Sequence, residues 1–290
     1  MPLWKRLLRL LAIIVLTPVT FLIGCQSRLI YHPRACTAEH AALLAEAKGR
    51  RIVFQTSQGR QTAFYIPPQA EGAAAPKTVW LCFGGNAALA LEWLLFTETW
   101  NDRCGFLLVD YPGYGECEGR PTPGSVRESS TAAAKALAAE LGLAETELRP
   151  RCRVLGHSLG CAAALMAAND LGVDRAVLVS PFTSMTDMGR IVLGWPLCLL
   201  NRHPFDNRAA LDEFARRAGA RGVIFHGTED EIIPLRMGRE LAEAHPDALE
   251  FHPVAGAGHN DILSAIAGRL GRVMETFESA ERPRAADAAR

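Results

Sequence analysis

The stretch that decides the fold is RVLGHSLGCAAALM, which runs from Arg153 to Met166. A short apolar run ends in Gly-His-Ser-Leu-Gly, and an alanine-rich segment with high helix propensity follows it. Glycines on both sides of a serine allow the chain to turn sharply from a strand into a helix. The pattern therefore places Ser158 either on such a turn, with its hydroxyl exposed, or at an ordinary helix start.

Short apolar runs recur along the chain and alternate with helical stretches. The runs are TVWLCF, GFLLVDYPGYG, RCRVLG, DRAVLVS, RGVIFHG and LEFHPV, and RIVFQTSQGRQTAFYIP adds two strands around a Ser-Gln-Gly turn. This alternation indicates an α/β fold with a mostly parallel sheet and helices on both faces. The 290 residues are enough for one such domain, which we expect over residues 51–280.

Three further segments have a predicted structure of their own. SVRESSTAAAKALAAELGL predicts a helix capped by Ser125, with Glu128 completing a capping box three residues later. Residues 186–221 are too long and too apolar for a plain connection, so they predict a small lid that ends in a helix. A final amphipathic helix is expected over residues 261–280, and a disordered tail over residues 281–290.

The first 25 residues differ from the rest of the chain. MPLWKRLLR carries three cations and no acid, and the next 16 residues, Leu10 to Cys25, are uncharged. A basic segment followed by an apolar one is typical of an export signal. The segment LIGC, which ends at Cys25, resembles the lipobox of bacterial lipoproteins, in which the cysteine is lipidated and becomes the mature N-terminus.

Two other interpretations of this segment stay open. One is an uncleaved signal anchor, although the uncharged run is short for a spanning helix of roughly 20 residues. The other is a soluble cytosolic protein. The first two interpretations place the domain at a membrane, either as an exported lipoprotein anchored at Cys25 or as a signal-anchored protein, with residues 26–50 as a connector that contains a short helix.

The composition argues against several kinds of partner. Lysine and arginine (31) balance aspartate and glutamate (31), so no basic excess indicates a nucleic-acid partner. No pair among the eight cysteines and the histidines has metal-ligand spacing, so we expect neither a metal nor another cofactor. Apart from Cys25, seven cysteines remain, so at least one stays unpaired if export allows disulfides.

Ser158 needs a base, because a serine hydroxyl is a poor nucleophile while it keeps its proton. His259 in AGAGHND fits, since it follows the expected strand LEFHPV on a glycine-rich loop. Asp230 in HGTEDEIIP follows the expected strand RGVIFHG and would orient the histidine. The order Ser, acid, His is that of one class of hydrolases. Glu229 and Glu231 are adjacent competitors for the acid.

A developing oxyanion needs two N–H donors. Gly84 and Gly85 follow the strand TVWLCF and permit close backbone approach, so the N–H groups of Asn86 and Leu159 are the candidate pair. A simple turn is the alternative for Gly-Gly-Asn. Because these signals each follow an expected strand in one consistent order, together they predict a metal-independent serine hydrolase.

With these residues in view, the sequence resembles the α/β-hydrolase superfamily, and most closely its membrane-anchored small-cap branch, which includes depalmitoylating thioesterases. The resemblance covers about residues 28–278 and rests on RLIYHP, FGGNA, DYPGYGECEGRPT, GHSLG, SPFTSMTDM, HGTEDEIIP and GAGHND. It implies Ser158 as nucleophile, Asp230 as acid and His259 as base. It also implies backbone donors at Asn86 and Leu159.

Two positions depart from the pattern of that branch. Gly84 stands where the branch usually has histidine, and Cys117 where it usually has serine. Because the oxyanion donor is a backbone N–H, the missing histidine is not expected to abolish catalysis. It is expected to alter the support of the loop or the preference for substrate.

The expected activity is therefore that of an esterase or thioesterase of class EC 3.1, which acts through an acyl-enzyme on a small acyl ester, a lipid or an acylated protein. Trp195 and Leu199 of the lid are expected either to line an acyl pocket or to pack the lid on the core. A peptidase or amidase and a perhydrolase are alternatives on the same residues. A non-catalytic binding protein of the same fold is the alternative from another class.

Overall fold

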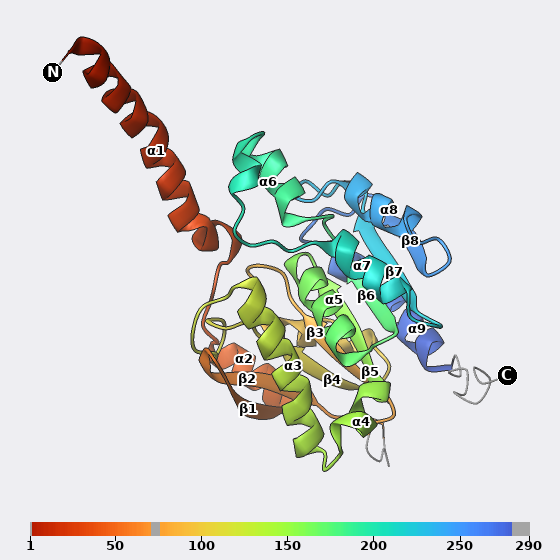
Figure 1. The fold of residues 1–290 in the computed structure, drawn as a ribbon. Coiled ribbons are helices and arrows are strands. Elements are labelled where there is room, and N and C mark those ends of the chain that lie inside the picture. Colours follow the sequence, from red (N-terminus) through yellow and green to blue (C-terminus); the bar gives the residue numbers. More distant parts are fainter. Residues whose placement is uncertain (1, 71–75, 280–290) are drawn as a thin grey trace.

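The centre of the computed structural model, which describes residues 2–70 and 76–279, is an eight-stranded sheet (Figure 1). Its order is β1-β2-β4-β3-β5-β6-β7-β8. Strand β2 is antiparallel to both of its neighbours, β1 and β4, and every pair from β4 to β8 is parallel. The strands are β1 (Arg50–Thr56), β2 (Gly59–Ile66), β3 (Val79–Phe83), β4 (Gly105–Val109), β5 (Cys152–His157), β6 (Arg175–Val179), β7 (Arg221–Gly227) and β8 (Leu249–Val254). The predicted α/β fold with a mostly parallel sheet is confirmed.

Helices cover both faces of this sheet, which explains why β3 and β4 are apolar without interruption and why β3, β4 and β6 are buried along their whole length. One face carries α3 (Pro123–Glu140), α5 (Leu159–Leu171), α7 (Asn207–Ala215) and α8 (Leu235–Glu243). The other face carries α2 (Ala38–Glu46), the 3-10 helix η1 (Ala90–Leu95) and α9 (Ile262–Ser279). The remaining short helices are η2 (Thr97–Thr99), which contacts η1 and α9, α4 (Glu145–Leu148) and η3 (Arg149–Arg151).

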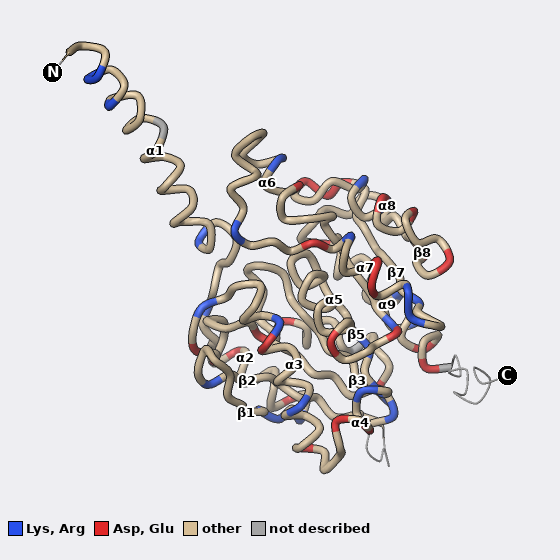
Figure 2. Tube along the Cα trace, in the orientation of Figure 1, with Lys and Arg blue, Asp and Glu red and all other residues tan. Residues whose placement is uncertain are grey.

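Helix α1 (Leu3–Ile30) projects away from this body (Figure 1). It is long and apolar enough to cross a membrane by length and composition, and a signal sequence has the same features. Figure 2 shows lysine and arginine but no acidic residue along it. The helix passes through Cys25 without a break, so the connector expected from residue 26 begins with the last turn of α1.

A cap lies over the carboxyl edge of the sheet and consists of α6 (Met185–Leu193) and the 3-10 helix η4 (Leu197–Leu200). This cap is shorter than the lid expected over residues 186–221. The difference is α7, which packs against α5 and buries Leu211 and Phe214 in the core of the domain. Burial against α5 therefore makes α7 part of the helical layer and not of the cap.

The start of α3 differs from the expectation. Thr122, not Ser125, is the N-cap, and its Oγ1 accepts a hydrogen bond from the N–H of Ser125 at 3.1 Å. Pro123 occupies the first helical position, where its fixed φ suits a helix start. Glu128 instead accepts hydrogen bonds from the N–H and hydroxyl of Ser57.

Helix α9 ends close to the expected boundary, whereas the tail expected over residues 281–290 lies outside the described residues. The eight cysteines, which all lie within the described residues, form no disulfide with one another.

Candidate active site

Ser158 stands on a sharp turn between β5 and α5. Its φ of 56° and ψ of −120° lie outside the helical and extended regions, and only two other described non-glycine residues have a positive φ. Its N–H donates a hydrogen bond to the carbonyl of Val179 at 2.9 Å, which ties the turn to the end of β6. The strand-to-helix turn expected from the sequence is therefore present at this residue.

The two glycines beside this serine are required by close backbone contacts. A Cβ on Gly156 would lie 2.4 Å from the carbonyl oxygen of Gly160. A Cβ on Gly160 would lie 2.0 Å from the carbonyl oxygen of Phe83 in β3. Both distances are shorter than any real contact of a Cβ atom, so the first turn of α5 approaches β3 and β5 only because these positions lack side chains.

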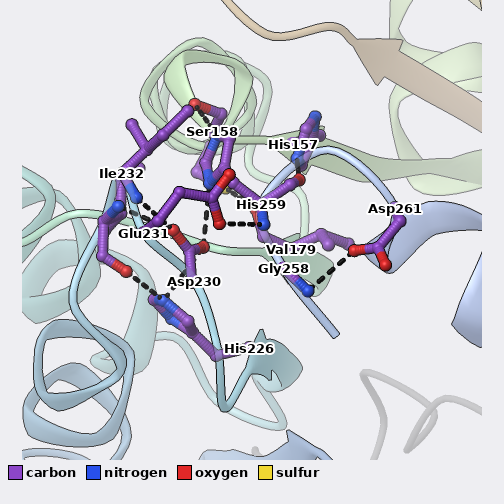
Figure 3. Close-up of polar contacts among 12 residues, drawn as sticks. His157, Ser158, Val179, His226, Asp230, Glu231, Ile232, Gly258, His259 and Asp261 are labelled. Atoms are coloured by element: carbon purple, nitrogen blue, oxygen red, sulfur yellow. Dashed lines mark hydrogen bonds and ion pairs between the residues drawn. The ribbon is translucent and has the colours of Figure 1, made fainter. Parts of the chain in front are cut away.

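Three of the expected residues meet at this turn (Figure 3). Nε2 of His259 lies 3.0 Å from Oγ of Ser158, and Nδ1 of the same ring lies 2.8 Å from Oδ2 of Asp230. They come from the loops that follow β5, β7 and β8. All three side chains are buried, so a continuous line of hydrogen bonds runs from a carboxylate to a serine hydroxyl with little competition from water.

The carboxylate of Asp230 is held on both oxygens. Oδ1 accepts from the N–H groups of Ile232 and Ile233 at 3.0 and 2.7 Å. On Oδ2, Nε2 of His226 lies 3.4 Å away, beside the bond from His259. Burial raises the pKa of Asp230, but the hydrogen bonds from His226, His259 and Ile233 outweigh it and hold this pKa well below its usual range. Asp230 is therefore ionised wherever the protein is folded near neutral pH.

The two acids next to Asp230 in the sequence, Glu229 and Glu231, do not bond to the ring of His259. Glu231 accepts a hydrogen bond from the backbone N–H of His259 at 3.2 Å, and so holds the loop and not the ring. The side chain of Glu229 is exposed. Asp261 accepts from the N–H of Gly258 at 2.7 Å and closes the loop on its other side (Figure 3). Of the three adjacent carboxylates, Asp230 is the one bonded to the imidazole of His259.

His157 and His226, for which no role was expected, also support the site. His157 packs its ring against His259 with centroids 5.1 Å apart, and its Nε2 lies 3.2 Å from the carbonyl of His259. Burial, aided by repulsion from His259, lowers the pKa of His157 to about 3, so its ring is neutral. His226 contacts Asp230, as described above. The position of both histidines at the carboxyl ends of β5 and β7 could have indicated that they lie at the site, because side chains of a parallel sheet converge there.

Asn86 and Leu159, the expected oxyanion donors, line the same cavity as Ser158. A Cβ on Gly85 would lie 3.5 Å from Cβ of Ser158, which shows how closely the loop after β3 approaches the serine. Within the described residues, neither backbone N–H of this pair has a hydrogen-bond acceptor. Both are therefore free to bind an oxygen of a ligand.

The loop that carries Asn86 is held by two tyrosines of the DYPGYG segment. The hydroxyl of Tyr111 donates to the carbonyl of Gly84 at 2.5 Å, and that of Tyr114 donates to the carbonyl of Asn86 at 2.6 Å. These bonds support the loop at the position where the resembled branch has a histidine. The thiol of Cys117, the other departure, exchanges hydrogen bonds with the backbone of Thr62 at 3.4 Å in each direction.

A cavity of about 700 Å³ opens from Ser158. Its walls are mostly apolar and come from α1, η1, the cap and the loops of the site. Trp195 and Leu199 are 74% and 66% exposed and do not line it, so neither of the two roles expected for them applies. Among the described residues, no group of three or more histidines, cysteines or acids is placed to hold a metal ion.

Comparison with known proteins decides the family. A sequence profile of the alpha/beta hydrolase family matches residues 72–221, which is more than half of the chain. The chain belongs to the alpha/beta hydrolase family. The hydrolase is also 31% identical over 263 residues to an uncharacterised protein of Mycobacterium tuberculosis (strain CDC 1551 / Oshkosh), a match that covers 88% of this chain and 89% of that protein.

A more distant relative of the hydrolase is the alpha/beta hydrolase domain-containing protein 17C of the mouse. It is 28% identical over 160 residues, which cover 55% of this chain and 47% of that protein. The match thus spans about half of each protein.

Solved structures share the fold of this hydrolase. An esterase of Pyrococcus furiosus superposes with a TM-score of 0.63 at 12% identity, over 86% of this chain and 98% of its own. An alpha-beta hydrolase of Vibrio vulnificus superposes with a TM-score of 0.64 at 18% identity, over 85% and 87%. At these identities the likeness shows the fold alone.

Proposed function

We propose that this hydrolase cleaves a carboxylic ester or thioester through an acyl-enzyme on Ser158. The observation that carries the proposal is the unbroken line of hydrogen bonds from Asp230 through His259 to Ser158, in the wall of a mostly apolar cavity. Each of the three residues has the chemical type and the partner that its role requires.

Acylation follows from the geometry of these groups. Ionised Asp230 accepts the Nδ1–H of His259, so Nε2 carries the lone pair and accepts the proton of Ser158 as Oγ attacks the acyl carbon. The carbonyl oxygen becomes an oxyanion, which the N–H groups of Asn86 and Leu159 would bind. The imidazolium then gives its proton to the departing alcohol or thiol, and the acyl group stays on Oγ.

Deacylation repeats these steps with water as nucleophile. His259 takes a proton from the water as its oxygen attacks the acyl carbon, and the same N–H pair receives the charge. Collapse of the intermediate breaks the bond to Oγ, and His259 returns the proton to Ser158. One water is consumed, one carboxylic acid is released, and the enzyme is restored.

The proposed substrates carry a long acyl chain, on a lipid or on an acylated protein. A cavity of about 700 Å³ lies in the range of drug-sized sites, and its apolar walls favour a hydrocarbon chain. The resemblance to the small-cap branch with its depalmitoylating thioesterases agrees with this class of substrate.

The proposed place of the enzyme is a membrane. Helix α1 supports this, either as an uncleaved anchor or as a signal that is removed ahead of a lipidated Cys25. In the second case residues 1–24 are lost, and the mature chain begins one residue before Gln26.

Hydrolysis of p-nitrophenyl butyrate by the full chain tests the proposed function. Ser158→Ala removes the nucleophile, and we expect turnover to fall by at least about 10³-fold. Ser264→Ala, on an exposed position of α9, is the matched control and is expected to keep the wild-type rate. Equal turnover of wild type and Ser158→Ala would exclude Ser158 as the nucleophile.

A further inference from the structure

The end of α1 is attached to the chain that leaves the cap. Side chains in the last two turns of the helix, and the residue after it, bond to residues 200–203. The contacts are Gln26 Nε2 to the carbonyl of Leu200 (2.7 Å), Arg202 N–H to Gln26 Oε1 (2.8 Å), Ser27 Oγ with His203 Nε2 (3.2 Å), and Tyr31 hydroxyl with His203 Nδ1 (3.1 Å). The cap is therefore held at the point where α1 joins the body.

The positions of the charged residues in α1 indicate where the end of the helix would lie relative to a bilayer. Between Arg9 and Arg28 lie 18 uncharged residues, which span about 27 Å at about 1.5 Å per residue. This length is close to the hydrocarbon thickness of about 30 Å. Gln26 and Ser27 then lie at the membrane interface, and the same holds if lipid chains are attached at Cys25 instead.

The outer surface of the cap, beside this end of α1, is apolar. We call it the cap face, and it consists of exposed side chains of α6, η4 and the turn between them: Ile191, Val192, Trp195, Leu197 and Leu199. Arg190 and Arg202 flank it and are exposed, and residues 188–202 contain no acid. Tryptophan beside arginine is typical of a surface that meets anionic lipid headgroups.

The cavity lies between α1 and the cap. Leu22, Leu29 and Ile30 of α1 form one wall, Val192 and Leu197 of the cap form another, and Ser158 lines the same cavity. Val192 and Leu197 belong to both the cap face and the cavity wall. An apolar surface therefore runs from the outside of the cap to the serine.

We propose that the cap face docks into the headgroup region of a phospholipid bilayer beside α1, so that a membrane-embedded acyl chain enters the cavity directly from the bilayer. Docking follows from the position of the cap face at the end of α1, and rests on the proposed membrane anchor. Entry of the acyl chain rests on the proposed hydrolase function as well.

Tryptophan fluorescence tests docking without any need for catalysis. The full chain is reconstituted in vesicles of phosphatidylcholine and phosphatidylglycerol, with or without brominated acyl chains, which quench nearby tryptophans. Because Trp195 is exposed in the cap face, brominated lipid should remove more emission from the wild type than from Trp195→Phe. Equal losses from the two proteins would overturn the proposal.

Hydrolysis in the same vesicles tests entry of the acyl chain. The variant Trp195→Asp/Leu199→Asp charges the cap face at two positions outside the cavity wall, and Val53→Asp is the matched control on the exposed surface of β1, far from α1 (Figure 1). We expect the cap variant to lose at least about tenfold on membrane-dissolved 4-methylumbelliferyl palmitate, and to keep its rate on soluble 4-methylumbelliferyl acetate. The control should keep both rates.

The outcomes separate this proposal from the function on which it depends. A cap variant that loses both esters equally, or neither, would overturn entry from the bilayer. A wild type that hydrolyses neither ester would instead contradict the proposed function, and the quenching experiment would still decide whether the cap face docks.

Discussion

The backbone of Ser158 is held in a conformation that side-chain-bearing residues rarely adopt. Such a residue costs about 1–3 kcal/mol and persists only where the surrounding structure fixes it. Here the bond to Val179 and the tight contact of Gly160 with β3 supply that constraint. The strained turn is also what directs Oγ at His259 and leaves the N–H of Leu159 unbonded, so strain and proposed chemistry have the same structural origin.

Asp230→Asn tests the role of the carboxylate at this scale. The amide can still accept from Ile232 and Ile233, but its NH₂ would face Nδ1 of His259 and favour the tautomer with the proton on Nε2. That tautomer cannot accept from Ser158, so we expect ester turnover to fall by about 10⁴-fold. Steady-state kinetics with the exposed Glu229→Gln as control measures this, and a loss of less than tenfold would contradict the assigned role.

Asp110 gives a prediction about pH and stability. Its Oδ1 accepts the N–H of Ala90 at 2.7 Å, and burial raises its pKa from 3.8 to about 7. Between these values the folded chain keeps a proton that the unfolded chain has lost, so the free energy of unfolding falls as pH rises through this window. Asp110→Asn lacks this titration. Its stability relative to wild type should therefore rise by up to about 4 kcal/mol between pH 4 and pH 8.

Urea unfolding across that pH range measures the effect of Asp110→Asn. The free energies of the two proteins should diverge as pH increases, whatever the offset between them at pH 4. Parallel curves would show that Asp110 does not titrate in the window.

Packing between elements is tightest where α5 begins. Gly160→Ala would place a Cβ 2.0 Å from a backbone oxygen of β3, and backbone cannot move aside cheaply. We expect this variant to lose more than about 3 kcal/mol of stability, or to fail to fold. Gly124→Ala is the matched control, because that position in the first turn of α3 has no neighbour closer than 4.0 Å.

Gly124→Ala should be neutral or more stable by up to about 1 kcal/mol, since alanine is the better helix former. Urea unfolding of both variants gives the comparison. Equal stability of the two alanine variants would mean that α5 does not approach β3 as described.

The sequence predicted elements well where one local pattern decides them. Each apolar run bounded by turn residues is a strand of the sheet, and the glycines around Ser158 mark the turn correctly. The prediction failed where a contact between residues far apart in the sequence determines the structure. Glu128 bonds to Ser57, 71 residues away, and α7 leaves the lid because it packs on α5. No contact of His226 was predicted, because its contact with Asp230 depends on how the loop after β7 folds back.

At the scale of the whole molecule, α1 connects the cap to the candidate oxyanion loop. The side chain of Asn86 donates to the carbonyl of Ile30 at 3.1 Å, and the carbonyl of Asn86 accepts the N–H of His32 at 2.9 Å. The same end of the helix holds His203 below the cap. The end of α1 is therefore bonded both to the candidate oxyanion loop and to the chain that leaves the cap. No local pattern in the sequence reveals this link, since it joins segments about 170 residues apart.

His203→Ala tests that connection. It removes the bonds to Ser27 and Tyr31, each worth about 0.5–1.5 kcal/mol, from the junction of α1 and the cap. Hydrogen exchange of the full chain in vesicles should become at least about fivefold faster in α6 and η4 and stay unchanged in α3. Unchanged exchange in the cap would show that this junction does not hold it.

The most direct test of the central claim is to trap the nucleophile. The full chain is treated with a fluorophosphonate, digested and analysed by mass spectrometry, because this reagent forms a stable adduct with a serine activated by a base. We expect one adduct, on Ser158, which is lost in His259→Ala as well as in Ser158→Ala. An unmodified Ser158, or an adduct elsewhere that survives in Ser158→Ala, would contradict it.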